Sequence, residues 1–155
     1  MKYFTINELI ASHTAFILGI KNIPGEKEKE HLKEMTENLL DPMREAWGSA
    51  VVVNSGYRCK ELNDAVGGSK TSAHPLGYAV DVVPRRKSFD EFVEFVVNWV
   101  KENNIAFDQI LIESNSKGAR WLHIGYKNEK GKQRRQIKNI YVEEPVNLAK
   151  LGWFL

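Results

Sequence analysis

Apolar residues recur every three or four positions in two stretches of the chain, which is the spacing of one face of a helix. In the first stretch, Asp41-Pro42 falls among the apolar positions, so we expect the proline to kink or divide that helix. Both stripes are interpreted as core-facing. They comprise Leu32, Met35, Leu39, Met43 and Trp47, and then Phe89, Phe92, Val93, Val96 and Val100.

Capping boxes predict where two helices begin. In this pattern a Ser or Thr caps the helix, and a Glu three residues later bonds back to the backbone of the cap. Thr5 with Glu8 predicts a short helix near the amino terminus. Ser88 with Glu91 predicts the start of the helix that carries the second stripe.

Short apolar runs between turn-forming residues predict five strands. Residues 114–118 are turn formers between two such runs, so the two runs should pair as an antiparallel hairpin. The last run would add an edge strand. Helices with these strands predict an α+β fold, a small antiparallel sheet flanked by helices. The predicted strands are 51–53, 78–83, 107–113, 120–126 and 134–142.

The chain is long enough to build one hydrophobic core without disulfide or metal. It has 155 residues, 43% of them hydrophobic, and we find no repeat, linker or low-complexity segment. We therefore expect a single domain over residues 1–155, and a monomer. Any bound metal would serve chemistry rather than folding. The lone cysteine, Cys59, excludes an intramolecular disulfide.

Charge and hydropathy argue against nucleic acid as a binding partner and against a membrane span. A formal net charge of +2 is too small to indicate nucleic-acid binding. No run of about 18 apolar residues occurs, so we expect no membrane span. The first residues lack the apolar core of a secretion signal, so we expect synthesis in the cytoplasm.

Two histidines and one aspartate form a candidate metal set. His74 follows a polar loop, while Asp81 and His123 lie in predicted strands. Catalytic zinc sites use three protein ligands and leave a fourth position for water, whose pKa falls to roughly 7. The set therefore predicts metal-assisted hydrolysis. Two other histidines, His13 and His31, lie in segments without such a pattern, and His31 is interpreted as part of a solvated helix face.

Three motifs in this chain together resemble a known family. They are Ser55-Gly56-Tyr57-Arg58, the Ser-x-His-x-x-Gly-x-Ala-x-Asp pattern from Ser72 to Asp81, and Trp121-x-His123. This combination resembles the zinc D-alanyl-D-alanine carboxypeptidase and endopeptidase family, which includes phage endolysins and is related in fold to hedgehog domains. The resemblance covers most of the chain, including the segments 4–9 and 39–44.

The resemblance implies both a ligand set and a substrate. His74, Asp81 and His123 would hold Zn²⁺, and Arg58 would contact the substrate. The substrate would be the stem or cross-link peptides of bacterial peptidoglycan. A protein made in the cytoplasm would then act on the cell wall, as a phage lysin released at lysis or as a bacterial remodelling enzyme.

One position departs from the family pattern. Relatives commonly place an Asp or Glu three residues before the last histidine, where this chain has Arg120. We predict that Glu113 supplies the general base instead. A hairpin that pairs Glu113 with Trp121 also pairs Leu111 with His123, and it places the carboxylate and the histidine on one face of the sheet. The competing interpretation pairs Glu113 with Arg120 or Lys117, and Asp108 is a second candidate base on the opposite face.

Three other functions compete with zinc hydrolysis. Cys59 beside Arg58 could act as a thiol nucleophile, although no pattern around it resembles a thiol peptidase. Two histidines and a carboxylate also occur in non-haem iron oxygenases, but there the first two ligands are nearly adjacent, and six residues separate His74 from Asp81. The Arg120 departure and the basic run 127–138 would suit a catalytically weak or inactive zinc-containing module that binds the cell wall.

Overall fold

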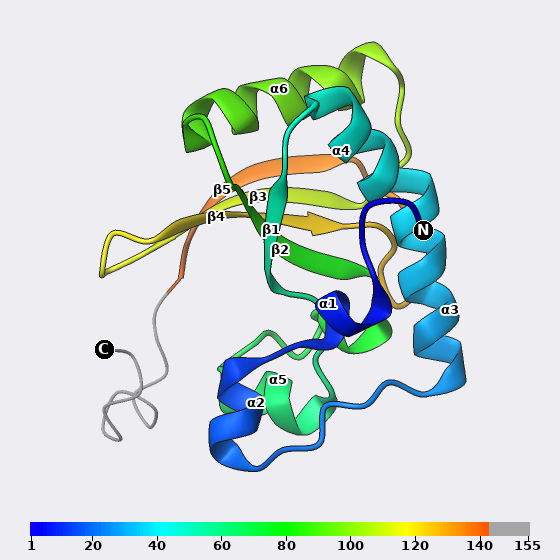
Figure 1. The fold of residues 1–155 in the computed structure, drawn as a ribbon, viewed down its shortest axis with the longest axis vertical. Helices are drawn as coiled ribbons and strands as arrows, with labels where there is room; N and C mark the ends of the chain where they lie inside the picture. The colour runs from blue at the N-terminus through cyan, green and yellow to red at the C-terminus, as the bar shows by residue number, and fades with distance from the viewer. Residues whose placement is uncertain (143–155) are drawn as a thin grey trace.

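The computed structural model describes residues 1–142 of the chain, which form helices around one sheet (Figure 1). The amino-terminal half supplies most of the helices, and the sheet is completed by the carboxyl-terminal half of this region. The elements in order are α1 (Ile6–Ile10), α2 (His13–Leu18), α3 (Glu26–Met35), η1 (Thr36–Leu40), α4 (Asp41–Trp47), β1 (Val51–Ser55), α5 (Lys60–Ala65), η2 (His74–Leu76), β2 (Ala79–Pro84), α6 (Phe89–Glu102), β3 (Gln109–Asn115), β4 (Arg120–Gly125) and β5 (Gln136–Val142).

The five strands form one sheet in the order β1-β2-β4-β3-β5. Strands β1, β2, β4 and β3 pair antiparallel, as predicted, whereas β5 pairs parallel with β3, so the sheet is mixed rather than wholly antiparallel. The reason is that β2 and β3 already occupy both edges of β4. The chain leaving β4 therefore reverses direction and takes the free edge of β3. This edge strand begins at Gln136, two residues later than predicted.

The sheet has one core face and one face toward a cleft. Side chains alternate along a strand, so neighbouring residues point to opposite faces. Val80 and Val82 on β2 and Leu122 and Ile124 on β4 are fully buried in the core. Between them lie Asp81 and His123, whose side chains point to the other face and line the cleft. The helix α6 lies along the sheet, and α1, α2 and α5 gather below it in Figure 1.

The first apolar stripe forms a helix that is divided, as predicted from Asp41-Pro42. A π-helical turn, η1, separates α3 from α4, and Pro42 lies in the first turn of α4. The backbone N–H of Asp41 bonds to the carbonyl of Thr36, five residues back. A wider turn accommodates a proline because its ring clashes with the preceding turn and it lacks an N–H. The apolar positions of this stripe are all buried.

Both predicted helix starts are confirmed, and each shows the bond from the backbone to the side chain of the cap residue. Thr5 accepts a hydrogen bond from the Glu8 N–H at the start of α1, and Ser88 accepts one from the Glu91 N–H at the start of α6. The α6 stripe packs on the core: Phe92, Val96 and Val100 are buried, and the other two positions are half-buried against the core.

Candidate metal centre and active-site cleft

Two strands and a short turn bring the three predicted ligands together. His74 begins η2, Asp81 lies in β2, and His123 lies in β4, where the sheet pairs it directly with Asp81. One candidate ligand atom from each residue can be chosen so that all three lie within 4.8 Å of one another. Within residues 1–142, this is the one group of three His, Cys, Asp or Glu residues with that geometry.

A backbone carbonyl orients the His74 ring. Because a carbonyl oxygen can only accept, Nδ1 of His74 donates to the Gly56 oxygen at 2.6 Å, and Nε2 keeps its lone pair. Nε2 is buried and has no hydrogen-bond partner. It lies 3.4 Å from Asp81 Oδ2. Burial lowers the pKa of His74, which favours the neutral imidazole that metals bind.

The His123 ring presents Nδ1 to the other oxygen of the Asp81 carboxylate. Nδ1 lies 3.0 Å from Asp81 Oδ1, while Nε2 is directed toward Gly125, where an added Cβ would lie 3.6 Å away. Burial alone would raise the pKa of Asp81. The His74 and His123 rings outweigh burial and lower that pKa well below its usual range, so the carboxylate is ionised.

This donor set fits a zinc ion. Ligand nitrogens and oxygens in a tetrahedral zinc site lie 2.0–2.2 Å from the metal and therefore about 3.3 Å from one another. His74 Nε2 lies 3.4 Å from one oxygen of the Asp81 carboxylate, and His123 Nδ1 lies 3.0 Å from the other. Both separations are close to that value, and one candidate atom from each of the three residues lies within 4.8 Å of the others. A buried imidazole nitrogen without a partner is also unfavourable unless something binds its lone pair. His74 Nε2, one Asp81 oxygen and His123 Nδ1 would be the three ligands, which leaves the fourth position open.

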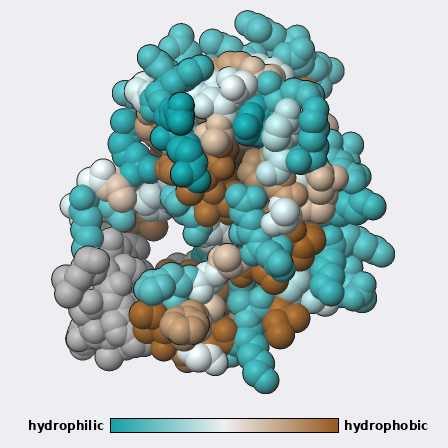
Figure 2. All heavy atoms as spheres, viewed as in Figure 1, coloured by the Kyte–Doolittle hydropathy of each residue, from teal (hydrophilic) through white to brown (hydrophobic). Residues whose placement is uncertain are grey.

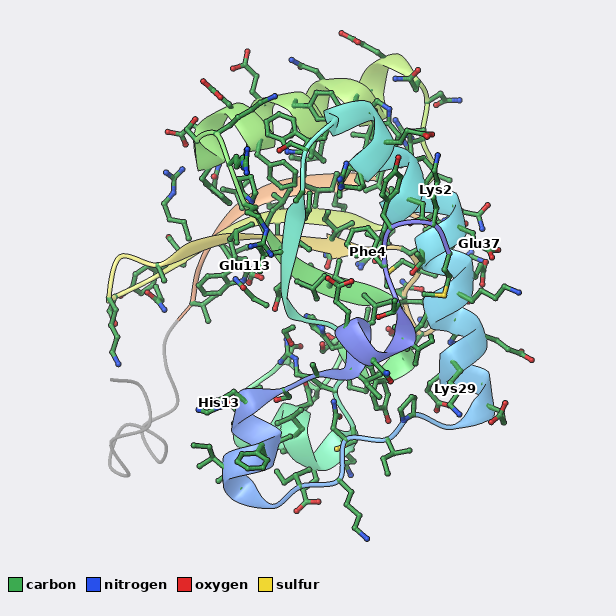
Figure 3. The ribbon with its side chains drawn as sticks, viewed as in Figure 1. Lys2, Phe4, His13, Lys29, Glu37 and Glu113 are labelled. Carbon is green, nitrogen blue, oxygen red and sulfur yellow. The ribbon has the colours of Figure 1, made fainter. Side chains whose placement is uncertain are left out.

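The candidate metal centre lies in the wall of a cleft of about 730 Å³. In Figure 2 the surface is hollowed between the sheet and the helices below it. The cleft is bounded on the sheet side by residues of β2, β3 and β4 and on the other side by α2 and the loop before His74. His13 and Glu113 both line it, from α2 and from β3 respectively, and Figure 3 places them on its two sides.

Arg58 lines the cleft just after β1, as the sequence predicted. Its Nη2 lies 3.5 Å from Asp81 Oδ2, and its Nη1 donates to Asn63 Oδ1 at 3.1 Å. Its buried Nε has no partner. Burial lowers the pKa of this guanidinium, although an arginine stays protonated at neutral pH. The side chain therefore holds a positive charge, with an unused donor, beside the candidate metal ligands.

Glu113 lies on the cleft face with the register that the hairpin predicted. It pairs with Trp121, and Leu111 pairs with His123. Glu113 Oε1 accepts from the indole Nε1 of Trp121 at 3.0 Å and lies 3.8 Å from His123 Nδ1. Burial, followed by the Asp81 charge, raises the pKa of Glu113. A carboxyl with a raised pKa beside candidate metal ligands suits proton transfer.

Arg120 takes no part in this cluster. Its guanidinium pairs with Asp90 at 2.6 Å and lies over the Phe89 ring, 4.7 Å from the ring centre. The competing interpretation that Arg120 neutralises Glu113 therefore does not hold. Asp108 also has a partner of its own, because Arg134 donates to both of its carboxylate oxygens at 2.8 Å.

The sequence model of the family described as Peptidase M15 matches residues 2–123. The chain belongs to the peptidase M15 family. The match covers well over half of the chain and ends on His123, so all three candidate ligands lie within it. M15 peptidases are metallopeptidases related to the D-Ala-D-Ala carboxypeptidases, which agrees with a His-Asp-His group that could bind a metal. No curated protein matches the sequence.

The structure and the M15 match both argue against two of the competing functions, the thiol peptidase and the iron oxygenase. Cys59 caps α5 and does not line the cleft, so its thiol is not placed to attack a substrate there. The jelly roll that usually carries the iron facial triad needs two stacked sheets, whereas residues 1–142 form one five-stranded sheet. None of the helices described for this M15 peptidase is long and apolar enough to cross a membrane.

Sequence reasoning missed several residues that support this M15 site. Asn63 binds Arg58 through Oδ1 and the Ser69 carbonyl through Nδ2. A Cβ on Gly68 would lie 2.1 Å from Asn63 Oδ1 and 2.9 Å from Arg58 Nη1, so a larger residue there would displace the Asn63–Arg58 pair. Trp121 was predicted as the cross-strand partner of Glu113, but the hydrogen bond from its indole to the Glu113 carboxylate was not. The Gly67-Gly68 pair was the one visible signal for a close approach, because glycine is needed where backbone packs tightly.

Proposed function

We propose that this M15 peptidase hydrolyses peptide bonds in the stem or cross-link peptides of bacterial peptidoglycan, with Zn²⁺ held by His74, Asp81 and His123. One observation carries the proposal: in the wall of a cleft, a buried, unpartnered imidazole nitrogen, His74 Nε2, lies 3.4 Å from an ionised aspartate, and a second imidazole lies 3.0 Å from the same carboxylate. We further propose that the chain acts on the cell wall as a single domain.

In the proposed reaction the metal would activate the carbonyl and the water, and a side chain would transfer the proton. When bound, zinc would act as a Lewis acid on the scissile carbonyl and make water acidic enough to attack at neutral pH. Glu113 would accept the proton of the attacking water and later return it to the leaving amine. Its position 3.8 Å from His123 Nδ1 puts the carboxylate beside the ligand cluster.

Arg58 would bind an anionic part of the substrate. Its charge faces the cleft beside Asp81, and Asn63 holds the guanidinium in place. In this position it can bind the terminal carboxylate of a stem peptide or stabilise the oxyanion that forms as the carbonyl is attacked. The first role would favour a carboxypeptidase, and the second serves an endopeptidase equally well.

The alternative, a zinc-containing module that binds the cell wall without cleaving it, has less support. Its two grounds were that Arg120 stands where relatives commonly have an acid, and that residues 127–138 are rich in basic side chains. Glu113 offers a carboxylate at the cluster instead. Two of the basic side chains are also engaged within the protein, Lys127 by Glu34 and Arg134 by Asp108.

Cleavage of defined peptidoglycan fragments tests the proposed function. Purified zinc-loaded protein is incubated with monomeric pentapeptide and with cross-linked dimer fragments, and the products are identified by mass spectrometry. We expect loss of terminal D-Ala or separation of the dimer, in each case with uptake of one water. The matched control is His74→Ala, which should be folded and inactive. Intact substrates with the zinc-loaded wild-type protein would favour the binding module.

A further inference from the structure

Helix α3 contacts the turn that carries His74, on the side of the site away from the cleft. Three of its residues, Glu28, His31 and Glu34, are spaced three apart and so lie on one side of the helix. His31 and Glu34 bond to the segment 76–78, which lies between His74 and Asp81 in the sequence, and the Glu28 carbonyl lies beside Gly77. Glu34 also binds Lys127, beyond β4. Neither His31 nor Glu34 lines the cleft.

His31 is bound to the turn by two kinds of contact. Its Nδ1 donates to the Leu76 carbonyl at 2.7 Å, because that oxygen can only accept. Its ring stacks on the ring of Tyr78, with 4.0 Å between centres and 13° between planes. His31 is thus half-buried and engaged at both ends of the segment 76–78, and the interpretation of it as part of a solvated helix face was wrong.

Gly77 lets the backbone of this turn approach the helix. Its φ is +83°, and a Cβ at this position would lie 2.6 Å from the Glu28 carbonyl oxygen. Its N–H donates to the His74 carbonyl at 3.2 Å and so closes the turn that begins at His74. Gly77, which contacts α3, is therefore hydrogen-bonded directly to the backbone of His74, the candidate ligand.

Glu34 links the turn to the strand that carries His123. Its Oε1 accepts from the Tyr78 hydroxyl and its Oε2 from Lys127 Nζ, both at 2.5 Å. Lys127 follows the end of β4 by two residues, and the Tyr126 N–H donates to the Tyr78 carbonyl at 2.7 Å. The two segments that adjoin the candidate histidine ligands are thus joined through one carboxylate on α3.

We propose that His31 and Glu34 are positioning residues for the metal centre, an inference that rests on the proposed zinc site. They hold the segment 76–78 against α3, and this fixes the turn from which the His74 ring reaches the ligand position. We refer to His31, Glu34, Tyr78 and Lys127 as the α3 brace. Metal affinity depends on the placement of ligands as much as on their identity, because a misplaced ligand must be moved at a free-energy cost when the ion binds.

The test compares zinc affinity in His31→Leu and His31→Asn. Leucine removes both the donor and the ring, whereas asparagine can place an amide N–H near the position of Nδ1. We expect His31→Leu to raise the Kd for zinc about 10-fold, the lower end of the range found when a group bonded directly to a metal ligand is lost, because His31 acts through the turn rather than on the ligand itself. His31→Asn should recover part of the affinity. The Kd is measured on metal-free protein by competition with a chromophoric chelator.

Two further measurements separate positioning from general loss of stability. The visible absorption of the Co²⁺-substituted protein reports ligand geometry, and we expect the band of His31→Leu to shift. Val96→Ala is the matched control, because it removes core packing from α6 and leaves the α3 brace intact. It should lower the Tm without changing the zinc Kd. Should His31→Leu fail to fold, Tyr78→Phe, which removes only the hydroxyl bonded to Glu34, takes its place, with a rise in Kd expected.

The outcomes are distinct. A wild-type Kd in folded His31→Leu and in Tyr78→Phe overturns the inference while leaving the proposed function intact. An equal rise in Kd in Val96→Ala also overturns it, because any loosening of the fold would then weaken the site. Wild-type protein that binds no zinc at all overturns the proposed function and the α3 brace with it.

Discussion

Asp81 Oδ1 and His123 Nδ1 lie 3.0 Å apart because their residues are paired directly across β2 and β4. The register of the sheet therefore sets the spacing between two of the three candidate ligands. A slip of one residue in either strand would turn that side chain toward the core, where Val80 or Leu122 now lies. The same sheet buries its other face, so folding and the assembly of the site depend on one pairing.

Removing the metal should abolish cleavage but leave the fold intact. The core lies on the other face of the sheet from the candidate ligands, so it does not need zinc to form. We expect chelator-treated protein to keep its circular dichroism spectrum and to regain activity with zinc. A zinc concentration 100 times the Kd should stabilise the native state by about 2.7 kcal/mol, observed as a rise in Tm. Unfolding upon chelation would mean that the metal is structural.

Arg58→Lys should weaken catalysis without loss of metal. Lysine keeps the charge but cannot reproduce the paired donors that now contact Asn63 and face the cleft. We expect zinc content to be unchanged and kcat/KM to fall. A higher KM at constant kcat would indicate binding of a substrate carboxylate, and a lower kcat would indicate stabilisation of the oxyanion. Wild-type values of both parameters would remove Arg58 from the site.

Glu113→Gln should lower kcat by roughly two to four orders of magnitude, the usual contribution of a positioned acid-base group. The amide keeps the size of the side chain and can still accept from Trp121 Nε1, so the fold and the metal should be retained. Arg120→Gln is the matched control, since Arg120 pairs with Asp90 outside the cluster. Near-normal turnover in Glu113→Gln, with Arg120→Gln also normal, would rule out Glu113 as the base.

Cys59→Ser should leave both cleavage and zinc content unchanged. The backbone N–H of Cys59 bonds to Asn22, and this contact does not depend on the sulfur. Activity measured beside the wild-type protein under reducing conditions decides the point. An inactive Cys59→Ser protein that still binds zinc would revive the thiol mechanism.

Short local patterns in the sequence predicted much of the fold. The helix starts at Thr5 and Ser88, the division at Pro42 and the pairing of Glu113 with Trp121 were all predicted and are confirmed. These features follow from local rules: cap chemistry, the missing proline N–H, and the alternation of side chains in a strand. The candidate ligand set was predicted from motif resemblance, and the structure brings its members together.

Contacts between distant segments were not predictable in the same way. The parallel pairing of β5 depends on which strand edges are already occupied, and no local pattern encodes this. The choice of Nδ1 rather than Nε2 as the His123 atom facing Asp81 depends on the rotamer of that ring. His31 was misinterpreted because its charged neighbours in the sequence are solvated, while its partners Leu76 and Tyr78 come from a turn more than 40 residues away.

Locating the metal tests the central claim most directly. Crystals of the wild-type protein grown with zinc are measured at X-ray energies on either side of the zinc absorption edge, and an anomalous difference map is calculated. We predict one strong peak per chain, about 2.0–2.2 Å from His74 Nε2, from an Asp81 carboxylate oxygen and from His123 Nδ1. A zinc-bound crystal whose peak lies away from these three residues, or no bound zinc at all, would contradict the account.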